Sequence, residues 1–398
     1  MDNSINNLID SALKGDGGKT LLRERFESKL EDVNLSFNQF IESYEMNFRT
    51  TNAILDGVFK YIDPVSLLKV AAFLKLSSED ILKECISQMP LDTRLQIEES
   101  KKKTFLLENF NLAALKKDGV INTLKDFEHI EKSILRTLGL KNIYDYTETE
   151  GITGLFSTVK CVEKDLRPKK MFKAKAIKIS ECLSNRNHYQ VDNLKSFFPN
   201  IRAYSTDIES GLLKVIRELY KIGVNVVVHP ALSSSRSRGI TVQNEGNPTI
   251  VLTDYGKKYS TLWFALLHEL YHIIFDWSDI IHNRIHVSDD DDKTVDKERL
   301  ANEFAREYMF PRTRMAAVTN KIHDPIAVKS YAAESNVHPS IIYDNYCYDH
   351  PESYSTYSKF VRIPWTKLYS SLIGSISHSN SPEEFCAHYQ SRIFNNLI

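Results

Sequence analysis

A pair of histidines inside an apolar helix constrains this chain most. Leu262–Leu267 is an uninterrupted apolar run that predicts a buried helix, and His268, Glu269 and His272 continue it. Residues four positions apart on a helix share a face, so both imidazoles can reach one metal ion while Glu269 lies beside them. Burying three polar side chains is costly unless something satisfies them. The spacing therefore predicts a zinc site, the plainer alternative being unconnected polar residues on one helix face.

The residues after His272 separate the subclasses of zinc peptidase. A metzincin continues with a glycine and then a third histidine at three-residue intervals, whereas this chain has Phe275 and Ser278 at those positions. The metzincin pattern is therefore excluded. A second helical pattern covers residues 298–309 and stops at Pro311. In a gluzincin-type site, this helix would supply the third ligand.

Glu298 is the best third ligand on the second helix. Asn302 lies one turn further on, so it could orient a ligand histidine while Glu298 binds the metal. Glu303 is the alternative ligand if the helix presents a different face to the histidines. Glu298 could also be a solvated carboxylate at a helix start. The packed side of this helix carries Leu300, Ala301, Phe304 and Ala305.

A zinc ion held by His268, His272 and Glu298 would leave one position open to a water whose pKa falls to about 7. Glu269 would act as the catalytic base, taking the proton of that water and passing it to the leaving amine of a peptide. The expected cofactor is therefore Zn²⁺.

Four blocks in this region, taken together, resemble the ImmA/IrrE zinc metallopeptidases. The resemblance spans roughly residues 206–345, with the blocks in the family's order and an acidic run, Asp289–Asp292, before the third-ligand helix. Two positions depart from the family pattern: Tyr271 replaces a small residue, and Asp276 stands where a histidine is common. The blocks are residues 239–242, 247–253, 263–272 and 298–305.

Composition indicates a multi-domain protein of the cytoplasm. A chain of 398 residues predicts two or three domains, and 51 basic against 52 acidic residues provide no overall field that would attract nucleic acid or an acidic membrane. Any DNA contact must then be local. Five scattered cysteines without a CxxC pair suit a reducing compartment. We find no signal segment or apolar span, so we expect a cytoplasmic protein without a membrane partner.

The N-terminal region predicts a small helical bundle. Residues 1–18 form an expected flexible arm that ends in a glycine-rich break, and residues 19–90 contain five short helical patterns. Ser36 can cap the second helix and Asn47 the third, which stops at Gly57. This order resembles the XRE-type helix-turn-helix fold, and the resemblance makes Phe48–Leu55 the recognition helix.

The early residues of a recognition helix meet DNA bases and phosphates. Arg49, Thr50, Thr51 and Asn52 are the chemically suitable set. Such a reader would bind operator DNA as a homodimer, because one module offers a small interface. Residues 19–84 hold more acidic than basic side chains, however, so a protein-docking bundle of the same fold is the alternative.

The remaining segments complete the expected organisation. The pattern predicts a helical connecting region at residues 91–205 and a C-terminal extension at residues 351–398. Neither has an identified role. Residues 206–350 form the ImmA/IrrE-like domain, in which strands at 224–228, 240–242 and 249–252, with a loop at 233–239, precede the zinc helix. His229, after the first strand, is either structural or able to polarise a substrate carbonyl. The predicted fold is multi-domain and mainly α, with an α+β gluzincin-like metallopeptidase domain.

This domain order resembles the longer antidote proteins of toxin–antitoxin modules and related phage and stress regulators. The resemblance implies a bacterial or phage regulator that binds operator DNA and cleaves or binds a protein partner encoded nearby, such as a repressor or toxin. The alternative is a DNA-binding antitoxin or transcriptional repressor whose zinc domain is a partner-binding scaffold without proteolytic activity.

Overall fold

A computed structural model describes residues 22–58, 62–87, 91–146, 155–158, 165–282 and 292–394 of the chain. The chain divides into two compact units, Met1–Phe105 and Leu106–Ile398. The expected flexible arm, residues 1–18, and most of the Asp289–Asp292 run lie outside the described residues.

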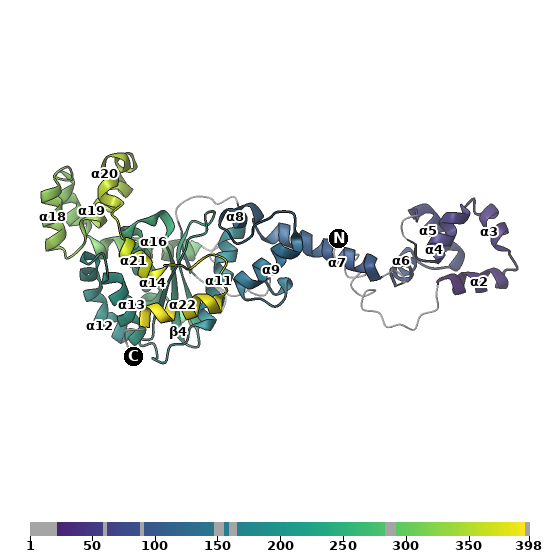
Figure 1. The fold of residues 1–398 in the computed structure, drawn as a ribbon, viewed down its shortest axis with the longest axis horizontal. Helices are drawn as coiled ribbons and strands as arrows, with labels where there is room; N and C mark the ends of the chain where they lie inside the picture. Colours follow the sequence, from purple (N-terminus) through teal and green to yellow (C-terminus); the bar gives the residue numbers. More distant parts are fainter. Residues whose placement is uncertain are drawn as a thin grey trace. The chain divides into compact units, whose positions relative to one another are not determined.

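The described part of the first unit contains the expected series of short helices (Figure 1). Ser36 and Gln39 form a capping box at the second of them, and the Asn47 side chain accepts hydrogen bonds from the first turn of the third. The core between the helices is aromatic, with Phe26, Phe40 and Phe73 in mutual contact. The helices are α2 (Leu22–Asp32), α3 (Phe37–Ser43), α4 (Phe48–Leu55), α5 (Pro64–Leu74) and α6 (Ser78–Ser87), and α7 (Leu91–Asn109) runs on into the second unit.

The second unit is an α+β domain built on one small sheet. The helices before and between its strands are α8 (Leu112–Lys117), α9 (Phe127–Leu138), α11 (Arg167–Cys182), α12 (Val191–Ile201) and α13 (Gly211–Lys221). Those after the strands are α14 (Tyr259–Phe275), α15 (Trp277–His282), α16 (Asp292–Met309), α17 (Arg312–Thr319), α18 (Pro325–Glu334), α19 (Pro339–Asp349), α20 (Tyr354–Val361), α21 (Thr366–Leu372) and α22 (Pro382–Phe394). Among the described helices, none has both the length and the apolar character needed to cross a membrane.

The sheet has the strand order β1-β3-β4-β2. Strands β3 (Ser237–Asn244) and β4 (Asn247–Thr253) form a hairpin whose two turn residues, Glu245 and Gly246, both have positive φ (49° and 84°), as a tight hairpin turn requires. Strand β2 (Asn225–His229) runs parallel to β4. The expected loop at 233–239 is shorter than predicted, because β3 already begins at Ser237.

A further strand, β1 (Leu155–Thr158), pairs antiparallel with β3 and comes from the region expected only to connect domains. Its partners in β3 are Thr241, Ile240, Gly239 and Ser237. Strand β3 lies between β1 and β4, and β4 lies between β3 and β2. Neither β3 nor β4 is therefore an edge strand of this sheet.

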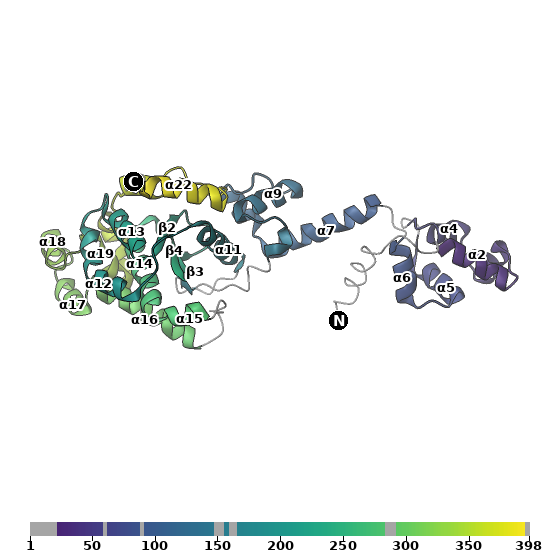
Figure 2. The same ribbon diagram turned by 90° about the horizontal axis from the view of Figure 1, so that it is seen from below.

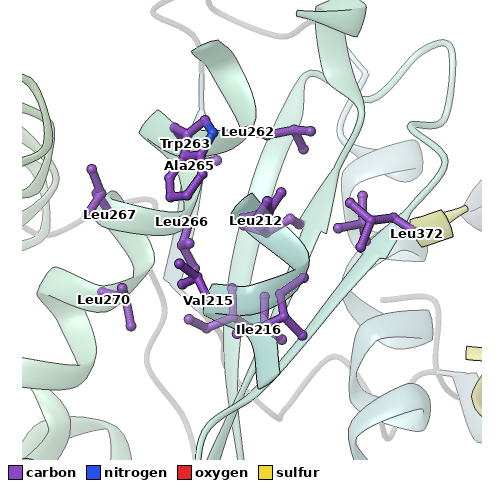
Figure 3. Packing of buried hydrophobic residues seen from close by; sticks show 14 of the residues in the cluster. Leu212, Val215, Ile216, Leu262, Trp263, Ala265, Leu266, Leu267, Leu270 and Leu372 are labelled. Atoms are coloured by element: carbon purple, nitrogen blue, oxygen red, sulfur yellow. The ribbon is translucent and has the colours of Figure 1, made fainter. Parts of the chain in front are cut away.

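The core of the second unit lies between the sheet and its helices. Figure 3 shows Leu212, Val215 and Ile216 of α13 near Leu266 and Leu270 of α14, all within one buried cluster. Helix α14 packs on β3 and β4 on one side and on α16 on the other. Helix α14 is therefore held between the sheet and the helix that carries Glu298.

The expected domain boundaries at residues 206 and 350 are not boundaries in the structure. Helix α11 packs on β3 and on the C-terminal helix α22, and Figure 2 shows α22 lying along the sheet domain. Phe385 and Ile393 of α22 are buried in the same core as Val226, and the Tyr389 hydroxyl donates a hydrogen bond to the Val226 carbonyl. Residues before 206 and after 350 thus belong to the core of the second unit, because α11 and α22 pack in the same buried cluster as the sheet.

Candidate metal centre

Helix α14 places its two histidines on the buried side. His268, Glu269 and His272 are all fully buried, in a helix whose other buried residues include Trp263, Leu266 and Leu270. Because the surrounding residues are apolar, the three polar side chains can point only at one another or at neighbours from β3 and α16.

The structure brings His268, His272 and Glu298 together as the expected ligand set. The His268 Nε2 atom lies 3.2 Å from His272 Nε2 and 3.2 Å from a carboxylate oxygen of Glu298. The second oxygen of Glu298 lies 3.4 Å from His272 Nε2. Ligands about 2.0–2.1 Å from a tetrahedral zinc ion are about 3.3 Å apart, so the spacing of these three side chains is suitable for one zinc ion.

The charges at this centre are strongly coupled. Burial lowers the pKa of the His268 imidazole. Burial also opposes the charged form of His272, but hydrogen bonds with Asp276 and Glu298 outweigh it and raise the pKa of His272 to about 9. Glu298 is likewise opposed by burial, and its contacts with both histidines lower its pKa to about 2. A metal ion would replace the proton of His272 as the positive charge of the group.

Asp276 holds His272 in the orientation that a metal ligand needs. Its carboxylate lies 2.9 Å from His272 Nδ1, so Nδ1–H donates to Asp276 and Nε2, the atom that would bind a metal, faces Glu298 and His268. Lys297 approaches the other oxygen of Asp276 at 3.5 Å and binds Asp279 at 2.6 Å. Sequence reasoning noted Asp276 only as a departure from the family pattern. Its position four residues after His272, on the same helix face, was the missed signal.

Glu269 points toward the sheet and is not part of the ligand group. The Thr241 hydroxyl donates a hydrogen bond of 2.7 Å to one oxygen of the Glu269 carboxylate. A side chain at Gly239 would bring its Cβ within 2.9 Å of the other oxygen, so the glycine leaves room for this carboxylate. Two residues of β3 therefore position the proposed base.

Residues 221–341 match the family model of the IrrE N-terminal-like domain, a peptidase M78 domain. The match covers less than a third of the chain and includes β2–β4, α14, α16 and all three candidate ligands. It supports the expected ImmA/IrrE-type, metallopeptidase-like domain and implies a metal, typically zinc. No curated protein and no solved structure matches this chain.

Asn302, Glu303 and His229, the other residues considered for the site, lie outside the ligand group. Asn302 lines a neighbouring pocket, and within the described residues no hydrogen bond joins it to either histidine; Asp276 has the orienting role expected of Asn302. Glu303 pairs with Arg299 on the exposed side of α16. His229 is buried beside Phe385, with Nδ1 near the Pro230 carbonyl, which is a structural position.

The candidate DNA-contacting residues of α4 differ in exposure. Arg49 is exposed and Thr50 is partly exposed. Thr51 is fully buried, and its hydroxyl donates to the Asn47 carbonyl, so its side chain, unlike that of Arg49, has no exposed surface to offer to DNA. The side-chain oxygen Oδ1 of Asn52 accepts a hydrogen bond of 2.9 Å from Arg23, which also binds Asp56. A DNA-reading role for Asn52 would require this contact to rearrange.

Proposed function

We propose that this chain is a zinc metallopeptidase of gluzincin type that cleaves a protein partner, such as a repressor or toxin encoded nearby, in the cytoplasm. The observation that carries the proposal is the tetrahedral spacing of His268, His272 and Glu298, with Glu269 held beside them by Thr241. The match to the IrrE N-terminal-like domain supports a metallopeptidase-like function.

The chain's own residues would divide the chemistry among them. His268, His272 and Glu298 would hold Zn²⁺, and Asp276 would fix the tautomer of His272. Zinc in such a site activates water and polarises the peptide carbonyl. The buried carboxylate of Glu269 would take a proton from water and deliver it to the leaving amine, with Thr241 fixing its direction.

Metal analysis combined with a Glu269→Gln variant tests this proposal. We expect about one zinc per chain, lost in His268→Ala and in His272→Ala. Glu269→Gln should keep zinc and the fold while losing proteolysis of the proteins encoded beside the chain, because it removes a base and not a ligand. Native protein that contains no zinc and takes up none would exclude the metal centre. Retained zinc without proteolysis in the wild-type chain would favour the partner-binding scaffold.

Glu298→Ala and Glu303→Ala form a matched pair for the third ligand. Both remove one carboxylate from α16, but only Glu298 lies against the histidines, whereas Glu303 pairs with Arg299. Glu298→Ala should therefore weaken zinc binding and Glu303→Ala should not. The opposite result would assign the ligand to Glu303.

We propose a second function, operator-DNA binding by the first unit as an XRE-type helix-turn-helix dimer. The connection between α3 and α4, residues 44–47, has the length of such a turn, and α4 carries the exposed Arg49 in its first turn. Arg49→Ala should weaken binding to upstream DNA by about 1–3 kcal/mol if it meets a base edge. A gel-shift titration that shows no preference for upstream over random DNA would leave the first unit as a protein-docking module.

A further inference from the structure

A pocket opens one helical turn from the candidate zinc ligands. Phe264 lies one turn before His268 on α14, and Asn302 lies one turn after Glu298 on α16, and both line this pocket. One turn of helix rises about 5.4 Å, which is between one and two residues of an extended peptide, so the pocket is close enough to hold a group next to a bond at the metal centre. The pocket is open to solvent on one side.

The lining of the pocket carries an excess of positive charge. Arg238, Lys258 and Arg306 line it together with a single carboxylate, Asp344. Lys258 binds Asp344 at 2.9 Å, and Arg306 binds Asp349 at 2.7 Å. These pairings neutralise two of the three cations and leave one positive charge, on Arg238.

Arg238 is a partly buried cation of this lining. Its guanidinium lies over the ring of Phe264, 5.2 Å from the ring centre, and its Nε atom is buried without a hydrogen-bond partner. Among the described residues, no carboxylate forms an ion pair with it. Burial lowers its pKa, which reflects the cost of keeping this charge away from water. A buried guanidinium is stabilised when an anion accepts its N–H groups, so an anionic ligand would relieve this cost.

We propose that Arg238 binds a carboxylate of the peptide substrate in this pocket, beside the bond to be cleaved. The planar fork of arginine donates two parallel hydrogen bonds to a carboxylate, and the single unneutralised charge of the pocket matches one carboxylate better than a doubly charged phosphate. The carboxylate is either an Asp or Glu side chain next to the scissile bond or the C-terminus of the substrate. This inference rests on the proposed peptidase function and adds a substrate class to it.

The test uses two hydroxamic acids, which ligate zinc at one end. The first probe is the monohydroxamic acid of adipic acid, with a carboxylate at its far end; the second has a neutral carboxamide in its place. Calorimetry on the zinc-loaded full chain should show that the carboxylate probe binds at least tenfold more tightly. Arg238→Gln should abolish this preference without changing the affinity for the carboxamide probe, and Arg238→Lys should retain part of it.

Arg299→Gln is the matched control, because it removes one exposed positive charge from α16 outside the pocket. It should keep the full preference. Equal binding of both probes by the wild-type chain, or an unchanged preference in Arg238→Gln, would overturn the role of Arg238 alone. Binding of neither probe to a chain that contains zinc would overturn both this inference and the proposed catalytic centre. Zinc content and circular dichroism establish that each variant is folded.

A second arm distinguishes the two sources of carboxylate. Heptapeptides blocked at both ends, with Glu or Gln at the centre, are compared with the Gln peptide carrying a free C-terminus, by fluorescence anisotropy on the Glu269→Gln chain. Tighter binding of the Glu peptide assigns the pocket to a side chain, and tighter binding of the free C-terminus assigns it to the end of the substrate. Equal binding of all three would overturn the assignment to a peptide carboxylate.

Discussion

At the scale of single residues, the candidate active site depends on side chains that bind neither metal nor substrate. Asp276 orients His272, Thr241 orients Glu269, and Gly239 makes room for the Glu269 carboxylate. Asp276 acts on a candidate metal ligand, whereas Thr241 and Gly239 act on the proposed base, so substitutions at these two groups of positions are expected to separate metal binding from catalysis.

Gly239→Ala should impair proteolysis while leaving zinc in place. Its new Cβ would lie 2.9 Å from a Glu269 oxygen, and the end of that side chain can move away at little cost in stability. A displacement of about 1 Å at a reacting group can lower kcat by about 100-fold. Zinc content, thermal unfolding and cleavage of the identified partner are measured together. Thr241→Val, which removes the hydrogen bond by another route, should act in the same direction; full activity in both variants would contradict the positioning role.

Lys175 should make the stability of the second unit rise with pH. Burial lowers the pKa of this lysine from about 10.5 to about 7, while Nζ donates to the His378 carbonyl. Below pH 7 both folded and unfolded chains are protonated, so the full cost of burying the charge is present. Between about pH 7 and pH 10.5 the unfolded chain binds more protons than the folded chain, so stability increases. In Lys175→Met, the increase in unfolding temperature between pH 6 and pH 9 should be smaller than in the wild-type chain. An identical rise in both proteins would contradict this.

At the scale of elements, capping side chains define the helices of the first unit. Ser36 caps α3, Asn47 caps α4 and Asp63 caps α5, each with a side-chain oxygen that accepts a backbone N–H. The α4 cap matters most for the proposed DNA contact, because it fixes the turn that carries Arg49.

Asn47→Ala should destabilise the first unit by about 1 kcal/mol, because the backbone N–H groups of Arg49 and Thr50 lose their acceptor. Asn47→Asp keeps an acceptor oxygen and is the control. All three tryptophans, Trp263, Trp277 and Trp365, lie in the second unit, so unfolding of the first is followed by circular dichroism with tryptophan fluorescence as the internal reference. A loss of stability in the Asp variant equal to that in the Ala variant would argue against capping.

At the scale of the whole molecule, the candidate metal centre joins two helices of the second unit. Its ligands lie on α14 and α16, which pack together within Leu106–Ile398. A ligand that binds only the folded state stabilises the unit that contains its site.

Removing zinc with a chelator should therefore lower the unfolding temperature reported by tryptophan fluorescence. At a free zinc concentration of 100 times Kd, the stabilisation lost is about 2.7 kcal/mol. The transition of the first unit, seen by circular dichroism, should stay unchanged. His272→Ala should not respond to the chelator at all, and a response equal to that of the wild-type chain would place the metal elsewhere.

Local patterns in the sequence by themselves determined three features. They place His268 and His272 on one face of α14, they predict the helix of Glu298, and they identify the caps of the first unit. These depend on residues a few positions apart, whose geometry the helix itself fixes. Tertiary structure alone decided that β1, α11 and α22 complete the sheet domain, that Thr51 is buried, and that Arg238 lines a pocket beside the candidate metal ligands. Those features depend on contacts between segments tens to hundreds of residues apart, for which periodicity and spacing carry no signal.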